Sequence, residues 1–125
     1  WLFSGSATRY PGMKLIFSHA GGALTGVMQR FSLQAETAES KPLFPAGIEA
    51  VLRSCFFDTA QAYSAATLGG LRAIVPVSQI LFGSDYPYRS ASESINGVVD
   101  CGVFSATELN AVTSGNASRL LNRLA

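Results

Sequence analysis

The stretch LIFSHAGG, residues 15–22, joins a short apolar run to the only histidine of the chain and then to two glycines. An uninterrupted apolar run of this length is typical of a parallel strand that is covered by helices on both faces. The glycines let the backbone come close to a ligand and leave N–H groups free for an anion. The stretch therefore predicts a buried parallel strand that ends at His19.

Two further apolar runs repeat this pattern along the chain. We predict strands over three segments, which are residues 13–18 (MKLIFS), 55–58 (CFFD) and 79–83 (QILFG). The helical spacing of apolar residues predicts helices over 24–31, 45–53 and 63–75. Residues 32–44 are polar, contain Pro42 and are expected on the surface. This alternation predicts a parallel sheet with right-handed crossovers, so that all three strands end at one rim.

After the third strand the sequence becomes helical in character. SASE at residues 90–93 and SATE at 105–108 each place a hydroxyl three residues before a carboxylate, which is the spacing of a capping box at a helix start. In SGNASRLL, Asn116 is expected to cap a last short helix. Leu120 and Leu121 of that helix are expected to face inward.

The composition limits the class of protein. A chain of 125 residues with 48% hydrophobic residues can form one domain with a packed core. Its 9 basic and 8 acidic residues are scattered singly, which argues against nucleic acid or an anionic membrane as a partner. The apolar runs are far shorter than the roughly 20 residues that a membrane-spanning helix needs.

The N-terminal sequence and the two cysteines bear on the origin and the cellular compartment of the chain. The start at Trp1 lacks the pattern of a signal peptide and indicates a chain cut from a longer one. Cys55 and Cys101 do not form a CxxC motif. We expect both to be reduced structural thiols, which is typical of a cytoplasmic protein.

Three polar side chains follow the predicted strands, and in parallel α/β folds this rim carries the chemistry. His19 is either bound to a backbone carbonyl or serves as an acid, a base or a metal ligand. Asp85, in LFGSDYP, favours metal ligation or general-base work over plain capping, since a carboxylate at the end of an apolar strand is costly to bury. Asp58 either caps the loop after it or supports a neighbouring ligand.

Two arginines are candidates for binding a carboxylate. The guanidinium groups of Arg30 and Arg89 match the planar geometry of a substrate carboxylate, although single arginines are usually solvated surface residues. The aromatic residues Phe82, Tyr86 and Tyr88 beside Asp85 fit either an aromatic substrate or the core.

Four motifs in order, YPGMKLIFSHAGG, CFFDTA, ILFGSDYP and SGNASRLL, resemble the C-terminal half of the amidohydrolase-related metal-dependent family, which includes aminocarboxymuconate-semialdehyde decarboxylase. The resemblance covers about residues 2–121. It implies an α/β fold in which residues 1–125 form one partial domain. This would be the C-terminal part of a TIM (β/α)8 barrel, about strands six to eight with the closing helices.

The resemblance also implies roles for single residues. His19 would be the acid or base beside a divalent metal, expected to be zinc, and Asp85 would ligate that metal. Arg30 would contact the carboxylate of a small carboxylic acid, in some members across a subunit boundary, so a homo-oligomer such as a dimer is expected. The family's other ligands are histidines, and the chain contains only His19. We therefore expect an incomplete metal site and little activity from this chain by itself, whether the parent enzyme is a decarboxylase or a hydrolase.

Two other interpretations remain open at this point. One is a non-catalytic half-barrel that self-associates or binds a partner through unpaired strand edges. The other is a small doubly wound binding domain, for which HAGGALTG fits the phosphate-binding pattern GxGxxG poorly.

Overall fold

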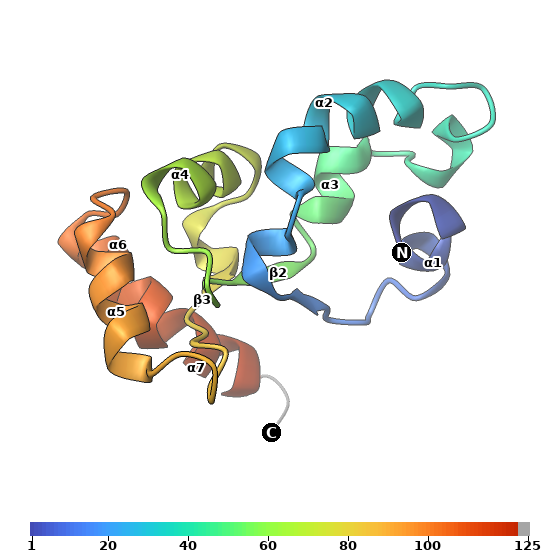
Figure 1. Ribbon diagram of the computed structural model, residues 1–125. Coiled ribbons are helices and arrows are strands. Elements are labelled where there is room, and N and C mark those ends of the chain that lie inside the picture. Colours follow the sequence, from blue (N-terminus) through green and yellow to red (C-terminus); the bar gives the residue numbers. More distant parts are fainter. Residues whose placement is uncertain (123–125) are drawn as a thin grey trace.

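A three-stranded parallel sheet lies at the centre of the computed structural model, which describes residues 1–122 (Figure 1). Its strands are β1 (Ile16–Phe17), β2 (Phe56–Asp58) and β3 (Ile80–Leu81), in the order β1-β2-β3. Phe57 pairs with Phe17 on one side and with Ile80 on the other. The predicted parallel sheet is confirmed. Its sequential strand order is that of a barrel segment, whereas doubly wound sheets reverse their order.

Helices connect the strands as predicted. The first crossover contains α2 (Leu24–Ala35) and α3 (Ile48–Leu52), and the second contains α4 (Ala65–Ile74). The two crossovers meet, because α2 and α4 lie side by side (Figure 1). Helix α2 continues four residues past its predicted end. The polar surface segment is therefore shorter than expected and holds one 3-10 turn (Lys41–Leu43).

The remaining elements are short helices at the two ends of the chain. A 3-10 turn (Leu2–Ser4) and α1 (Ser6–Arg9) precede the sheet. After it come α5 (Ala91–Asp100), α6 (Ala106–Asn110), a π-helical turn (Ala111–Gly115) and α7 (Asn116–Asn122). Two more 3-10 turns flank the strands, at His19–Gly21 and Val77–Gln79. None of the helices within residues 1–122 has the length and apolar content of a membrane crossing.

The two predicted capping boxes differ in the structure. At α6, Ser105 accepts the N–H of Glu108, and the Glu108 carboxylate accepts the N–H of Ser105, so the box is complete. At α5, Ser90 caps the N–H of Glu93, but the Glu93 carboxylate turns to Tyr63 and Arg89. The prediction for residues 90–93 is therefore only half right, because Tyr63 and Arg89 bind the Glu93 carboxylate instead.

The core lies between the sheet and the helices. Phe57 of β2 and Ile80 of β3 are buried in a cluster with Leu68 and Leu71 of α4 and Val98 of α5. This packing buries the middle of the sheet below the rim where the strands end.

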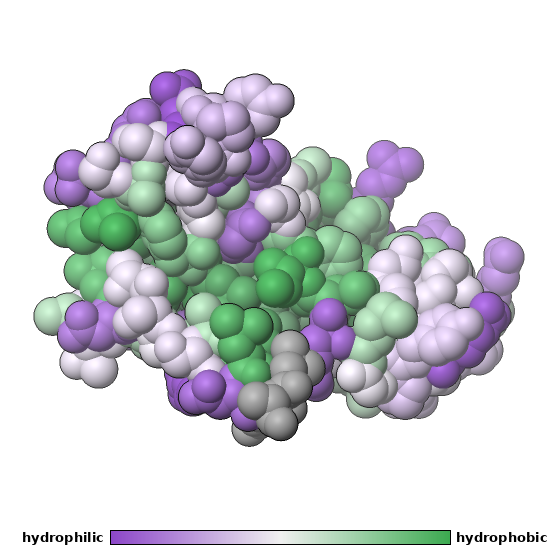
Figure 2. Space-filling model, turned by 90° about the horizontal axis from the view of Figure 1, so that it is seen from below, coloured by the Kyte–Doolittle hydropathy of each residue, from purple (hydrophilic) through white to green (hydrophobic). Residues whose placement is uncertain are grey.

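Three expectations about burial and caps are wrong. The strand at β1 is not buried on both faces, since Ile16 is 53% exposed. Strands β1 and β3 each pair only with β2 within residues 1–122, so the outer edge of β1 has no partner strand in this part of the chain. Figure 2 shows a broad apolar area on the face seen from below. Leu121 is 61% exposed and does not face inward, unlike Leu120.

Asn116 is not a helix cap. Its backbone is helical, with φ −69° and ψ −44°, because the π-helical turn runs directly into α7. The side chain is buried and donates to the carbonyl oxygens of Val77 and Ile80 at 2.7 and 2.8 Å. It therefore ties the last helix to β3.

Candidate active site

The structure brings His19 and Asp85 together at the rim where the strands end. His19 follows β1 after one residue and Asp85 follows β3 after three. The Nε2 atom of His19 lies 3.9 Å from Oδ2 of Asp85. The two side chains are 49% and 30% exposed, so the space between them is open to solvent. A separation of 3.9 Å is too long for a direct hydrogen bond but short enough for one atom to contact both groups.

The ring of His19 has a defined tautomer. Its Nδ1 atom lies 2.9 Å from the carbonyl oxygen of Ala60. A carbonyl only accepts, so Nδ1 must carry the proton. In the neutral ring, Nε2 therefore carries the lone pair, and this atom is the one that lies 3.9 Å from Asp85. The expectation of a histidine bound to a backbone carbonyl and that of an acid–base histidine are compatible, because each uses a different ring nitrogen.

Asp58 lies behind His19 and contacts it through the backbone. Its Oδ1 accepts the N–H of His19 at 2.8 Å and that of Ala60 at 3.0 Å, and its Oδ2 accepts the hydroxyl of Ser18 at 2.6 Å. The carboxylate thus caps the loop after β2, as expected, and also supports the neighbouring strand end.

Backbone strain is concentrated at this rim. Four non-glycine residues within the described chain have positive φ angles: His19 at 58°, Ala20 at 54°, Gln61 at 48° and Asp85 at 63°. Such conformations cost on the order of 1–3 kcal/mol each and tend to gather at functional sites. All four belong to the His19–Asp85 pair or to residues adjacent or bonded to it.

Gln61 is a site residue that the sequence analysis missed. Its Nε2 donates to Oδ2 of Asp85 at 2.5 Å and so orients the carboxylate. The signal that could have found it is its place in the loop after β2, three residues beyond Asp58, where side chains reach the same rim.

The two arginines do not join this group. Arg30 is exposed on α2, and no hydrogen bond or ion pair within residues 1–122 links it to His19 or Asp85. Arg89 forms an ion pair with Glu93 at 3.3 Å. The role of Arg30 in substrate binding stays a prediction. Tyr86 and Tyr88 are 82% and 77% exposed beside Asp85, so they are not core residues.

A metal ion is not held by these residues alone. Among residues 1–122, no three or more His, Cys, Asp or Glu side chains are grouped closely enough to hold one. His19 and Asp85 provide at most two donors, whereas a zinc site needs three or four protein ligands. The donor set present in this part of the chain does not fit a complete metal centre.

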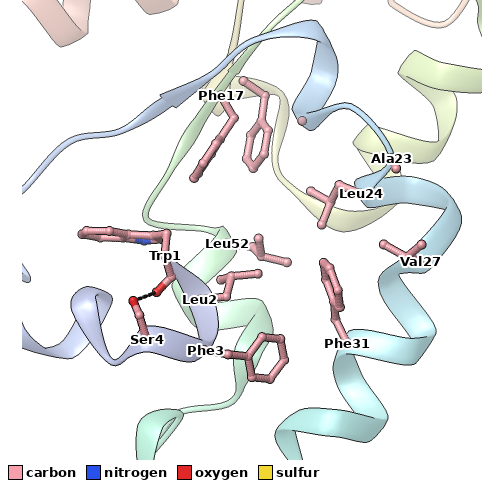
Figure 3. A pocket seen from close by; sticks show the side chains of 12 residues that line it. Trp1, Leu2, Phe3, Ser4, Phe17, Ala23, Leu24, Val27, Phe31 and Leu52 are labelled. Carbon is pink, nitrogen blue, oxygen red and sulfur yellow. Dashed lines mark hydrogen bonds between the residues drawn. The ribbon is translucent and has the colours of Figure 1, made fainter.

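An apolar cavity of about 480 Å³ lies beside β1 and the turn that follows it. The side chains of the N-terminal turn, such as Trp1 and Phe3, line it opposite Phe31 of α2 and Leu52 of α3 (Figure 3). Neither His19 nor Asp85 lines it, and its walls are mostly apolar. It lies between the N-terminal segment and helices α2 and α3, and neither of the two candidate catalytic side chains reaches it.

Known proteins share this chain's fold and part of its sequence. The chain is 37% identical over 94 residues to 6-methylsalicylic acid decarboxylase of Penicillium expansum; the match covers 69% of this chain and 27% of that enzyme. A crystal structure of an amidohydrolase II has a TM-score of 0.82 at 25% identity, with 97% of this chain and 39% of that chain covered.

A third similar protein is a dihydroxybenzoic acid decarboxylase from Polaromonas, solved with bound manganese and 2-nitroresorcinol. It has a TM-score of 0.82 at 22% identity, with 99% of this chain and 38% of that chain covered. The chain thus spans well under half the length of these proteins, and its fold is part of a (β/α)8 barrel. The family model described as amidohydrolase matches residues 1–123, and the chain belongs to that family.

Proposed function

We propose that this chain supplies the acid–base histidine and one metal-ligating aspartate of a metal-dependent decarboxylase that acts on a small aromatic carboxylic acid. The observation that carries the proposal is the convergence of Nε2 of His19 and Oδ2 of Asp85 at 3.9 Å. The 37% identity to 6-methylsalicylic acid decarboxylase favours decarboxylation over hydrolysis.

His19 is arranged to move a proton at Nε2. Because Nδ1 donates to Ala60, Nε2 accepts a proton from solvent and can deliver it to the ring carbon that bears the carboxylate. The bond between that carbon and the carboxylate then breaks, carbon dioxide leaves, and the ring carbon keeps the proton. The exposed rings of Tyr86 and Tyr88 offer flat surfaces for an aromatic acid.

Asp85 is arranged to bind a cation. Gln61 occupies part of its Oδ2 and restrains the side chain, and the left-handed backbone turns the carboxylate toward His19. A divalent metal would orient the substrate carboxylate and polarise it. Its remaining ligands would come from outside residues 1–122. Zinc and manganese both suit such oxygen and nitrogen donors, and manganese is the ion in the Polaromonas enzyme.

A chimeric enzyme tests the proposed roles of His19 and Asp85. Residues 1–122 replace the corresponding C-terminal segment of 6-methylsalicylic acid decarboxylase, and carbon dioxide release and metal content are measured. We expect Asp85→Asn to lose most metal and activity, and His19→Gln to keep the metal and lose turnover. Asp100→Asn, an exposed change on α5, is the matched control. An unchanged rate and metal content in Asp85→Asn would show that the assignment is wrong.

A second measurement needs no grafting. His19 is the only histidine, so its ring protons give isolated nuclear magnetic resonance signals in the intact chain. Added Mn²⁺ is paramagnetic and broadens the signals of nearby protons. We expect this broadening at His19 in the wild type and much less of it in Asp85→Asn. Equal broadening in both proteins would contradict a cation site at Asp85.

Self-association is a second candidate function, favoured by the unpaired outer edge of β1. Strand β1 has no second partner strand within residues 1–122, and its Ile16 is exposed. Such edges pair readily with another chain, and a homo-oligomer such as a dimer would cover them. Light scattering should show a dimer that Ile16→Lys converts to a monomer. A monomeric wild-type chain would rule this candidate out.

We further propose a cytoplasmic location. Cys55 and Cys101 are both free thiols in the described chain, and reducing compartments keep thiols in that state.

A further inference from the structure

Asp58 contacts both the backbone of His19 and the loop that holds its ring. We propose that Asp58 is a positioning residue that selects the tautomer of His19 in which Nδ1 carries the proton. The use of that tautomer in catalysis rests on the function proposed above. The selection itself rests only on the contacts described here.

The first set of contacts holds the backbone of His19. Oδ1 of Asp58 accepts the N–H of His19 at 2.8 Å, and Oδ2 accepts the hydroxyl of Ser18 at 2.6 Å. Hydrogen bonds to a charged acceptor are about twice as strong as neutral ones. They are well suited to holding His19 at its unfavourable φ of 58°. The carboxylate of Asp58 therefore fixes the position of the His19 backbone, from which the imidazole ring projects.

The second contact holds the acceptor of the ring. The same Oδ1 of Asp58 accepts the N–H of Ala60 at 3.0 Å. The carbonyl oxygen of Ala60 in turn lies 2.9 Å from Nδ1 of His19. One carboxylate thus fixes the histidine and the carbonyl against which its ring is placed.

The third strand prevents the carboxylate from shifting. A Cβ atom added at Gly83 would lie 3.0 Å from Cβ and Cγ of Asp58, so the backbone after β3 packs directly against this side chain. The hydroxyl of Thr59 exchanges hydrogen bonds with the N–H and the carbonyl of Gly83 at 3.1 and 3.2 Å. The ends of all three strands therefore meet at Asp58.

The consequence is a preference between two ring states. With the proton on Nε2 instead, the lone pair of Nδ1 would face the carbonyl oxygen of Ala60, and two acceptors would oppose each other at 2.9 Å. If Asp58 did not hold that carbonyl in place, the loop could relax and both tautomers would be accessible. A fixed tautomer keeps Nε2 free to accept a proton beside Asp85.

The test reads the tautomer directly. His19 is the only histidine, so chain labelled with ¹⁵N-histidine gives one pair of ring signals, measured at alkaline pH where the ring is neutral. In the wild type we expect Nδ1 to show the shift of a protonated ring nitrogen and Nε2 that of an unprotonated one. In Asp58→Ala the two shifts should move toward each other as the tautomers mix. A merely structural role of Asp58 would leave the two shifts unchanged in the folded variant.

Two controls separate geometry from charge and from distant effects. Asp58→Asn keeps an oxygen that accepts both N–H groups and an amide that can donate to Ser18, so its tautomer should match the wild type. Asp100→Ala removes an exposed carboxylate on α5 and should also leave both signals in place.

If Asp58→Ala does not fold, Gly83→Ala is the alternative variant for this measurement. It retains the carboxylate but presses a methyl group against it, and the two ring shifts should again converge. Unchanged ring shifts in folded Asp58→Ala, or in folded Gly83→Ala, overturn the proposal. The measurement needs no metal, substrate or turnover. Failure of the grafted enzyme to release carbon dioxide would therefore refute the proposed function without affecting this result.

Discussion

The side chain of Asn116 donates a hydrogen bond to the carbonyl oxygen of Ile80 at 2.8 Å, across 36 residues of sequence. The same amide also donates to the carbonyl oxygen of Val77 at 2.7 Å. The Ile80 carbonyl belongs to β3, and the Val77 carbonyl, in the 3-10 turn before it, also accepts the N–H of Ile80. The last helix is therefore attached to the sheet by a buried amide as well as by apolar packing.

Replacing Asn116 should destabilise the chain strongly. Asn116→Ala removes the side-chain donor from the buried carbonyl oxygen of Ile80, whereas that of Val77 keeps the N–H of Ile80, and one unsatisfied buried group costs about 1–3 kcal/mol. We expect the free energy of unfolding in urea to fall by about 1–3 kcal/mol. The exposed neighbour Leu121→Ala should change it by less than about 0.5 kcal/mol. Equal effects of the two changes would contradict a stabilising role for the hydrogen bonds of Asn116.

Two helical glycines should respond in opposite directions to alanine. A Cβ atom at Gly97 of α5 would overlap the ring of Tyr63, so Gly97→Ala should lower stability by about 1–3 kcal/mol. Gly69 of α4 has open space at that position, and Gly69→Ala should raise stability by about 0.5–1 kcal/mol through helix propensity. Thermal melting of both variants measures the difference, and destabilisation of both would mean that α4 is packed more tightly than described.

The two thiols should differ in reactivity. Burial raises the pKa of the Cys55 thiol, so at neutral pH it stays protonated, and its thiolate is the reactive form. Cys101 is only half-buried at the end of α5. In the folded chain, iodoacetamide should alkylate Cys101 first, with Cys55 following at the rate of unfolding. Mass spectrometry of peptides over time measures both rates. Faster labelling of Cys55 in native buffer would contradict the burial.

The capping box of α6 should make stability depend on acid. The N–H and the hydroxyl of Ser105, together with the Arg72 guanidinium, lower the pKa of Glu108 below its ordinary value. The carboxyl is more acidic in the folded than in the unfolded chain. Its contribution to stability is therefore present above the unfolded pKa and is lost as pH falls through the folded pKa.

Urea unfolding at a series of acidic pH values tests this dependence. The wild type should lose stability as the pH falls through the carboxylate range, and Glu108→Gln should lose less. Glu36, exposed after α2, provides the control change Glu36→Gln, which should leave the wild-type slope in place. A wild-type slope retained in Glu108→Gln would show that other carboxylates cause it.

The strands at the centre of the fold were predictable from local pattern. The runs at residues 55–58 and 79–83 are apolar and bounded by polar residues, and β2 and β3 lie within them. His19, Asp58 and Asp85 could be placed at one rim for the same reason, since parallel strands end on the same side. The apolar runs were sufficient for these predictions, because whether a segment forms a buried strand depends mainly on its own residues.

Contacts between distant segments were not predictable in this way. Asn116 has the local pattern of a cap, yet its partners lie 36 and 39 residues away. Gln61 contacts Asp85 and the carbonyl of Ala60 contacts His19, and neither pair shares a local pattern. The sequence pattern predicts Ile16 to be a core residue, but it is exposed because β1 pairs with β2 alone within residues 1–122.

The sequence alone therefore determined which segments become strands and helices and which polar side chains stand at the strand ends. Only the tertiary structure decided which nitrogen of His19 holds the proton and which groups orient Asp85. The physical reason is that burial is decided segment by segment, whereas a hydrogen bond depends on positions within a few tenths of an ångström. Those positions are set by the paths of the loops and by the packing of side chains from all three strands.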